Sequence, residues 1–326
     1  MIDILSSGAL NQVQDLGRKG HMQQGISRGG AMDAPALAAA NLLVDNPPTA
    51  AGLEIGMFPF RVRFRQTTRF ACTGAHCVVR IDDRVLPPWW SAVAQPGQTL
   101  TIEPPLLGLR SYLAIAGGID VPVLLGSAST DNKGSFGGFE GRGLRRGDAL
   151  PVAAAASSVM QPREFGCVPA RVAAFWQQLR EGRVTLQAIA GAEYPLFTEQ
   201  AQAAFCDQDW IVTREANRTG FRLDSASGER LELRHPVELL SHGILPGTVQ
   251  VPPSGNPIVQ MAEANTCGGY PKIATVNSAD LWQLAQTPAG VSVRFSLTTL
   301  DKAIAEAQAL QQWLVKLQAD LSLLRR

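Results

Sequence analysis

Short segments with the period-two alternation of half-buried β-strands recur along this chain and constrain its fold more than any other feature. Phe60–Phe64 alternates apolar and charged side chains, so one face of the strand can enter a core. Residues 78–81 and 84–86 flank Asp82 and Asp83 and predict a hairpin. Further strands are expected at the N-terminus and at residues 98–102, 110–115, 183–189, 231–233, 248–251, 258–261, 273–276 and 291–295. Short strands separated by turns are typical of barrels and sandwiches.

Two helices are expected among these strands. Asp33 as N-cap and Pro35 in the first turn precede the strong helix formers of residues 36–43, and Asn46-Pro47-Pro48 ends the segment. Thr298 with Asp301 resembles a capping box and predicts the start of a last helix. Its apolar residues form one stripe, which can pack on its own domain, the commoner use, or on a partner. The stripe consists of Leu300, Ile304, Ala307, Leu310, Leu314, Leu317, Leu321 and Leu324.

The length and a compositional break predict two domains. The chain has 326 residues, more than one average domain of roughly 100–200. Residues 153–169 begin with a run of alanines and serines and are typical of a linker. We expect a β-barrel domain at residues 1–165 with Gly-rich loops at 11–30 and 117–147, a second at 166–298, and a C-terminal amphipathic helix at 299–326. The predicted fold class is mainly β with α, that is α+β.

Composition excludes several classes of protein. With 45% hydrophobic and 17% charged residues, the chain is globular rather than disordered. The net charge of +1 comes with no cationic run, so neither nucleic acid nor an acidic membrane is an expected partner. We expect a cytoplasmic location, because no signal peptide pattern and no run of about 18 apolar residues occur. The five scattered cysteines are normal for a reducing compartment.

Several familiar catalytic and cofactor motifs are missing or incomplete. No Walker-type ATP loop and no Met-Lys-Met biotin attachment site occur, so no covalent biotin is expected on this chain. The four histidines lack metal-ligand spacing, no metal site is expected, and Cys72, His76 and Cys77 are expected in a core. The segment 25–29 matches Gly-x-Ser-x-Gly, but the residues before it are polar. We therefore expect a loop there and no nucleophile elbow.

Three polar segments remain as candidate sites. Gln14, Asp15 and Arg18 lie in a Gly-containing turn that can hold a ligand amide or carboxylate, or can form an internal Asp–Arg pair. The second segment, residues 126–142, offers hydroxyls, glycine amides and two cations as an anion cradle, unless it is a flexible surface loop. The third, residues 267–272, follows Glu263 and Asn265. Its paired glycines allow a close ligand approach, or form a β-bulge at a barrel corner.

Taken in order, these segments resemble the biotin-dependent carboxyltransferase / allophanate hydrolase subunit 2 family. The resemblance runs from about Ile4 to about Phe295. It is carried by residues 13–18, 25–33, 40–44, 53–55, 111–122, 126–130, 217–223, 238–243, 249–252 and 268–271. Within the family, residues 126–142 and 240–247 look most like the branch of the 5-oxoprolinase C subunit. Glu263 and Asn265 stand where the family usually has Asp and Gln, and Cys267 where Thr is usual.

The resemblance implies two tandem cyclophilin-like β-barrels and an enzyme subunit that is inactive alone. It implies pairing with a kinase-inhibitor-like B subunit and joint action with an A subunit, in which ATP drives the opening of 5-oxoproline to L-glutamate. ATP with Mg²⁺ is the expected cofactor, at or near a site shared with the B subunit. The family also contains the carboxyltransferase part of urea carboxylase and regulators of a sporulation kinase. The alternatives are therefore a non-catalytic regulator and a carboxyltransferase subunit.

The resemblance and the residue chemistry together give the candidate site residues. Asp15, Arg18, Glu263, Tyr270 and Lys272 are the expected catalytic residues. The expected substrate-binding residues are Gln14, Ser127, Ser129, Thr130, Lys133, Arg142, Arg218, Gln250 and Asn265. The arginines and Lys133 can neutralise carboxylate or phosphate charge. The two carboxylates can bind the lactam nitrogen or Mg²⁺ that arrives with ATP, while Tyr270 and Lys272 orient the carbonyl.

Overall fold

A computed structural model describes residues 1–155 and 164–324 of the chain in two compact units. The first unit comprises residues 1–19, 29–173 and 313–326, and the second comprises residues 20–28 and 174–312. Both units are discontinuous in sequence, whereas the predicted domains 1–165, 166–298 and 299–326 are continuous. Part of the predicted linker, residues 156–163, lies outside the described residues.

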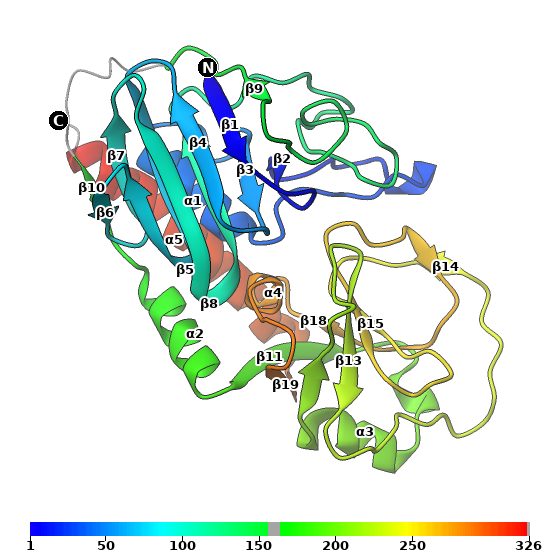
Figure 1. The fold of residues 1–326 in the computed structure, drawn as a ribbon. Helices are drawn as coiled ribbons and strands as arrows, with labels where there is room; N and C mark the ends of the chain where they lie inside the picture. The colour runs from blue at the N-terminus through cyan, green and yellow to red at the C-terminus, as the bar shows by residue number, and fades with distance from the viewer. Residues whose placement is uncertain (156–163, 325–326) are drawn as a thin grey trace. The chain divides into compact units, whose positions relative to one another are not determined.

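The first unit is built on a ten-stranded sheet (Figure 1). Its strand order is β10-β7-β5-β8-β4-β1-β9, with β3 attached to β8, β2 attached to β3 and β6 attached to β5. The strands are β1 (Ile2–Ser6), β2 (Gln12–Gln14), β3 (Gly52–Ile55), β4 (Phe60–Phe64), β5 (Thr68–Ile81), β6 (Arg84–Leu86), β7 (Trp90–Ala94), β8 (Thr99–Ile115), β9 (Ala149–Leu150) and β10 (Phe165–Gly166). The predicted alternating strand at 60–64 and the predicted hairpin, now β5–β6, are both confirmed.

The predicted pair of strands at 98–102 and 110–115 is wrong, because β8 runs through both. Pro104 and Pro105 lie between the region that pairs with β4, which ends at Ile102, and the region that pairs with β3, which begins at Ser111. There β8 pairs only with β5 on its other side. Proline lacks a backbone donor and is tolerated where one edge of a strand has no partner.

The core of the first unit holds the cysteines of the Cys72–Cys77 segment, as predicted. Both thiols are buried in the apolar cluster of the sheet, together with the stacked rings of Phe64 and Phe70. Burial raises the pKa of the Cys72 thiol and raises that of Cys77 to about 11. Neither thiol is therefore a thiolate at neutral pH, and both behave as core side chains.

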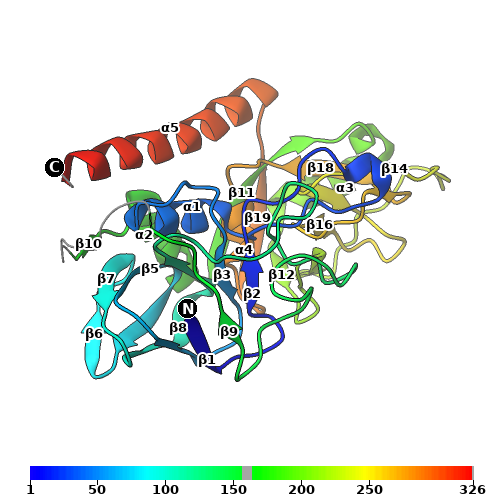
Figure 2. The ribbon, with the colours of Figure 1, turned by 90° about the horizontal axis from the view of Figure 1, so that it is seen from above.

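Helix α1 (Ala34–Leu43) confirms the predicted first helix. The Asp33 carboxylate accepts from the Ala36 N–H at 3.0 Å, and Pro35 occupies the first turn. Residues 36–43 are all buried, and α1 packs on β5 and β8 (Figures 1 and 2). The alanine-rich sequence allows this close approach, since Thr73 of β5 donates to the Ala36 carbonyl at 2.7 Å.

The second unit contains a closed seven-stranded barrel in the order β11-β18-β15-β16-β13-β12-β19. The strands are β11 (Arg183–Ala190), β12 (Trp210–Val212), β13 (Gly220–Ser225), β15 (Thr248–Gln250), β16 (Ile258–Gln260), β18 (Lys272–Val276) and β19 (Ser292–Leu297). A separate two-stranded sheet pairs β14 (His242–Gly243) with β17 (Cys267–Gly268). With the helices below, these sheets confirm the predicted α+β class.

Three helices of the described chain were not predicted: α2 (Ala170–Arg180), α3 (Glu199–Asp207) and α4 (Leu281–Ala285). Aromatic contacts hold all three, because Phe205 of α3 stacks on Phe295 and Trp282 of α4 packs against Phe175 of α2. The predicted strand at 231–233 is wrong. Only Leu233 forms a bridge, with Phe197, and the segment serves the start of α3 through the Thr198 N–H to Glu232 carbonyl bond.

Helix α5 (Leu300–Leu324) confirms the predicted last helix but not its cap. Thr299, rather than Thr298, accepts from the Lys302 N–H at 3.4 Å. In the first unit, Leu321 is buried against the end of α1, with Leu314 and Leu317 beside it. This part of the apolar stripe packs on the chain's own first unit, as predicted. Leu300, at the start of the helix, is 60% exposed. No helix among the described residues is long and apolar enough to cross a membrane.

Candidate functional site

In the first unit, the Asp15 carboxylate organises the predicted serine-rich loop. It accepts from the Ser127 hydroxyl at 2.7 Å, the Ser129 hydroxyl at 2.6 Å, the Ala128 N–H at 2.7 Å and the Gly17 N–H at 2.7 Å. Asp15 is 8% exposed, and its two carboxylate oxygens together accept these four hydrogen bonds. The structure brings the first and second predicted segments together, with Asp15 as the positioning group of the loop.

Arg18 lies at the other side of the same loop and is 1% exposed. It donates to the Ser129 carbonyl, and its guanidinium lies 4.6 Å from the ring centroid of Phe136. Gly137, with φ of +70°, passes so close that a Cβ there would meet Nη2 of Arg18 at 2.5 Å and would collide with Ser129. Only glycine therefore fits this turn, which explains one glycine of the Gly-Gly pair at 137–138.

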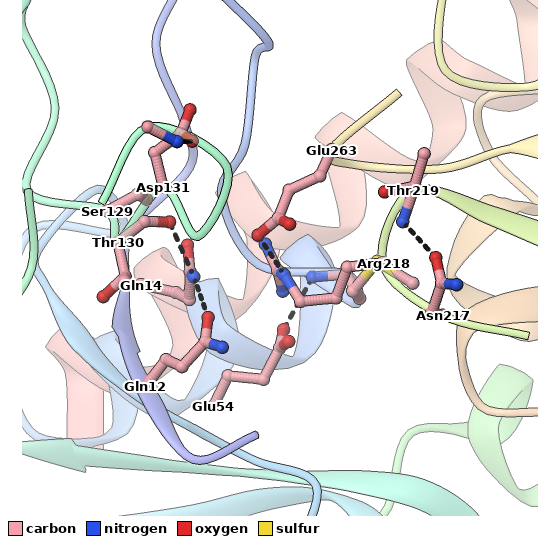
Figure 3. A network of polar contacts seen from close by, with 12 residues as sticks. Gln12, Gln14, Glu54, Ser129, Thr130, Asp131, Asn217, Arg218, Thr219 and Glu263 are labelled. Carbon is pink, nitrogen blue, oxygen red and sulfur yellow. Dashed lines mark hydrogen bonds and ion pairs between the residues drawn. The ribbon is translucent and has the colours of Figure 1, made fainter. Parts of the chain in front are cut away.

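Gln14 extends this cluster. Its amide donates to Gln12 Oε1 at 2.9 Å and to the Thr130 carbonyl at 3.2 Å (Figure 3). Thr130 in turn donates through its hydroxyl to the Val13 carbonyl at 3.0 Å. Gln14 Oε1 is buried and has no hydrogen-bond partner among the described residues. The predicted residues Gln14, Ser127, Ser129 and Thr130 thus form one buried polar cluster with Asp15 and Arg18.

A second buried carboxylate of the first unit, Glu54, escaped the sequence prediction. It is 2% exposed and accepts from the Met32 N–H at 2.7 Å and from the Tyr112 hydroxyl at 2.8 Å, with Arg110 at 4.0 Å. Burial, and then the charges of Glu54 and Asp33, raise the pKa of Tyr112 well above its usual range. The sequence signal that could have identified Glu54 as a buried carboxylate is its position between the apolar residues Leu53 and Ile55 of a short strand.

Arg142 is committed to carboxylates of its own loop. It forms two parallel hydrogen bonds to Asp148, at 2.8 and 2.9 Å, and two to Glu140 Oε2, at 2.6 and 3.0 Å. The pKa of Asp148 is lowered, first by its hydrogen bond to Arg142. Lys133 lies in an exposed turn of the same segment. Substrate binding by Arg142 and Lys133 stays a prediction.

We expect Arg142→Ala to lower stability by about 1–2 kcal/mol and to leave the KM of the assembled enzyme unchanged. Because the folded-state pKa of Asp148 is depressed, the pair stabilises the fold above the ordinary aspartate pKa of about 3.9 and is lost as pH falls through the folded value. Denaturation midpoints at pH 7 and pH 3 measure this. A raised KM with an unchanged midpoint would instead support the anion cradle.

In the second unit, Arg218 and Glu263 form a buried ion pair. Arg218 is 6% and Glu263 4% exposed, and Nε lies 2.7 Å from Oε1 (Figure 3). Their backbones are joined as well, by the Glu263 N–H to the Arg218 carbonyl at 2.8 Å. Asn217 fixes the turn that carries Arg218, because its Oδ1 accepts from the Thr219 N–H at 2.8 Å. The structure therefore brings the two predicted residues Arg218 and Glu263 into direct contact.

A layer of buried polar side chains lies on the outer face of the second unit's barrel. Gln250, Gln260 and Lys272 alternate with the fully buried Val249, Val259 and Ile273 of the same strands, so they point to the opposite face. They are only 4–6% exposed. Strand β17 covers this layer at Gly268, whose carbonyl accepts from Lys272 Nζ at 3.0 Å.

Lys272 belongs to a chain of three titratable groups. Its Nζ lies 3.3 Å from His242 Nδ1, and His242 Nε2 lies 3.3 Å from Glu193 Oε1. His242 Nδ1 also lies 3.2 Å from the Leu240 carbonyl, so the tautomer decides whether Nδ1 accepts from the ammonium or donates to that carbonyl. In the accepting tautomer Nε2 can donate to the carboxylate. Burial lowers the pKa of Lys272, and the Glu193 charge partly opposes this. A lysine with a lowered pKa gives up its proton more readily than a solvated lysine and is a candidate for proton transfer. Sequence reasoning missed His242 and Glu193.

We expect Lys272→Met to flatten the pH dependence of stability just below the ordinary lysine pKa of about 10.4. Because the folded-state pKa is below the ordinary lysine value, the unfolded chain binds more protons in the window between the two values. The unfolding free energy of the unchanged chain therefore rises with pH in that window, and this rise disappears with the ammonium. Lys316→Met, at an exposed lysine, is the control, and thermal melting across pH is the measurement. Parallel pH curves for Lys272→Met and the unchanged chain would contradict the prediction.

A cavity of about 1090 Å³ opens beside this layer. Gln250, Asn265, Gly268 and Tyr270 contribute to its wall, and Tyr270 is 48% exposed. Its apolar wall comes from residues 231–240 and 251–253. Pockets that combine an apolar wall with a few polar groups are the common form of small-molecule sites. Of the predicted residues of the second unit, Gln250, Asn265 and Tyr270 thus line one cavity, with Lys272 behind Gly268.

Among residues 1–155 and 164–324, no group of three or more His, Cys, Asp or Glu side chains could hold a metal ion. The two candidate carboxylates already have partners, since Asp15 is saturated by donors and Glu263 is paired with Arg218. Mg²⁺ in proteins requires free carboxylate oxygens and waters. The donor set of the described residues therefore does not fit a metal site held by this chain's side chains.

Comparison with known proteins identifies the family to which the chain belongs. Residues 24–297 match the profile of the carboxyltransferase domain, subdomain A and B. The chain is 42% identical to the C subunit of 5-oxoprolinase from Escherichia coli K12, over 97% of both chains, and 37% identical to that of Haemophilus influenzae, over 93% of both. Its fold is similar to the crystal structure of Kluyveromyces lactis urea amidolyase, with a TM-score of 0.85 and 24% identity over 97% of this chain and 20% of that one.

Proposed function

The chain belongs to the family of carboxyltransferase domains with subdomains A and B, and we propose that it acts as the C subunit of an ATP-dependent 5-oxoprolinase. The reaction opens the lactam of 5-oxoproline to L-glutamate. The observation that carries this proposal is the 42% identity over 97% of both chains with a protein of that name. A match over the whole length supports the same role for the whole chain.

The chemistry of a lactam explains what the polar residues would do. A lactam is an amide stabilised by resonance, and its hydrolysis requires activation of the carbonyl oxygen. The cavity of the second unit supplies apolar side chains against which the ring can pack and a polar side with Gln250 and Tyr270 to orient it. Lys272, linked to His242 and Glu193, is the group of this chain suited to move a proton near the cavity.

ATP with Mg²⁺ is part of the proposal and would activate the lactam oxygen by phosphorylation. The described residues hold no group of three or more His, Cys, Asp or Glu side chains that could bind a metal ion, and we propose that the partner subunits hold most of the nucleotide and its ion. The proposed partners are the A subunit of the same enzyme and its kinase-inhibitor-like B subunit. Exposed apolar side chains beside β14 support a protein contact there, since Leu240 is 91% and Leu245 60% exposed.

The test is glutamate release from 5-oxoproline with ATP, using this chain co-purified with the products of its neighbouring genes. Each component is left out in turn. We expect glutamate only when this chain, its partners and ATP are all present. Glutamate formation without this chain would overturn the proposal, and so would formation by this chain alone.

A carboxyltransferase subunit of a urea-type amide carboxylase is the second candidate, and the description of the family itself favours it. The same cavity would then hold the acceptor amide and carboxybiotin. The experiment adds a biotin carrier, bicarbonate and ATP, with urea as the acceptor. Carboxyl transfer that depends on this chain, without glutamate release, would establish this alternative. A non-catalytic regulator would show turnover in neither assay.

A further inference from the structure

The polar layer on the outside of the barrel contains two amides that the described protein does not satisfy. Gln260 Nε2 donates to Gln250 Oε1 at 2.9 Å, and this bond uses one group of each amide. Gln250 Nε2 and Gln260 Oε1 are both buried without a hydrogen-bond partner among the described residues. Burying an unsatisfied polar group is unfavourable, and native structures hold few of them. Two such atoms in contacting side chains require one group, a water or a ligand, that both donates and accepts.

The two unsatisfied atoms define the chemistry of that ligand. One is a donor and the other an acceptor, so together they complement the C=O and N–H of an amide. Rotating both amides by half a turn exchanges nitrogen for oxygen but leaves the same pair, one donor and one acceptor. A carboxylate or phosphate would satisfy only the donor. A substrate amide satisfies both, and so does a single water molecule, which the substrate amide would displace.

We propose that Gln250 and Gln260 form a subsite that recognises the amide of the substrate, reached from the cavity beneath β17. The substrate class rests on the proposed function, because the lactam of 5-oxoproline and urea share this amide. Gln250 lines the cavity of about 1090 Å³. Recognition by two fixed amides orients the carbonyl and rejects ligands that lack an N–H.

Gly268 of β17 lies directly over this subsite. A Cβ at position 268 would meet Gln250 Nε2 at 2.5 Å, so only glycine allows β17 to lie so close to the amide. The cover is held by the two-residue pairing with β14 and by Lys272, which donates to the Gly268 carbonyl. Displacing this short segment exposes the two amides to the cavity. Lys272 thereby lies next to a bound amide.

The experiment compares Gln250→Leu and Gln260→Leu with the unchanged chain, each assembled with its partner subunits. Leucine keeps the volume and removes donor and acceptor together. We expect the KM for 5-oxoproline to rise about tenfold for each variant, the value of one amide hydrogen bond. The melting temperature should change little, because each variant removes one unsatisfied buried atom but leaves the other partner of the Gln260–Gln250 bond unsatisfied in its place. Gln200→Leu, at an exposed glutamine of α3, is the matched control and should change neither.

A second arm uses Gly268→Ala, which pushes a methyl group against Gln250 and should raise the KM without a change at either amide. A lowered melting temperature with an unchanged KM in the glutamine variants would show a purely structural role and overturn the inference. If the unchanged chain releases no glutamate, the KM for urea in the carboxylation assay is measured instead. A tenfold rise there supports the subsite while the proposed function fails; an unchanged KM for urea overturns the subsite as well.

Discussion

Arg218→Ala should lower the unfolding free energy of the second unit by about 3–5 kcal/mol, the largest stability effect expected in this chain. The substitution leaves the Glu263 carboxylate buried, at 4% exposure, without the guanidinium that lies 2.7 Å from it. A buried charge without its partner is far less stable than either the pair or an apolar replacement. The denaturant midpoint of the second unit, followed by the fluorescence of buried Trp210, measures the loss.

The double variant Arg218→Met with Glu263→Leu is the control for this effect. Because both charges are then absent, the midpoint should return most of the way to that of the unchanged chain. Glu263→Asp shortens the side chain by one methylene and should show an intermediate loss. An unchanged midpoint in Arg218→Ala, together with lost glutamate release, would contradict the structural role and assign the guanidinium to the substrate.

Asp15→Asn should lower the unfolding free energy of the first unit by about 2–4 kcal/mol. The Asp15 carboxylate accepts four hydrogen bonds, two of them from the backbone N–H groups of Gly17 and Ala128. An asparagine amide replaces one acceptor oxygen by a donor. The serine hydroxyls can rotate to accept, but a backbone N–H cannot, so one donor faces another.

Ser127→Ala and Ser129→Ala are the graded controls for Asp15. Each removes a hydroxyl that donates to Asp15 and also leaves one backbone N–H without its acceptor, that of Ser129 in Ser127→Ala and that of Asp15 in Ser129→Ala. Each should therefore cost about 1–2 kcal/mol, less than Asp15→Asn. Thermal melting together with protease cleavage of the loop at 126–142 gives the measurement. If Asp15→Asn melts like the unchanged chain and only glutamate release is lost, the carboxylate acts on the substrate and the positioning role is wrong.

Local pattern was enough to predict the elements whose signal is local. The alternation of Phe60–Phe64, the hairpin at 81–84 and the cap at Asp33 depend on residues a few positions apart, and all three are confirmed. The family could also be identified from the sequence, because its motifs lie in order along the chain. Helices α3 and α4 escaped because they are short and are held by aromatic contacts with distant residues.

The sequence by itself determined the β-rich class, the first and last helices, the family and most of the residues that now surround the two polar clusters. The tertiary structure decided which charges are already satisfied: Arg142 by Asp148, Glu54 by Tyr112, and Asp15 by the serine loop. It also decided which amides remain unsatisfied beside a cavity. The physical reason is that whether a buried polar group is satisfied depends on partners far away in the chain, and no local pattern encodes them.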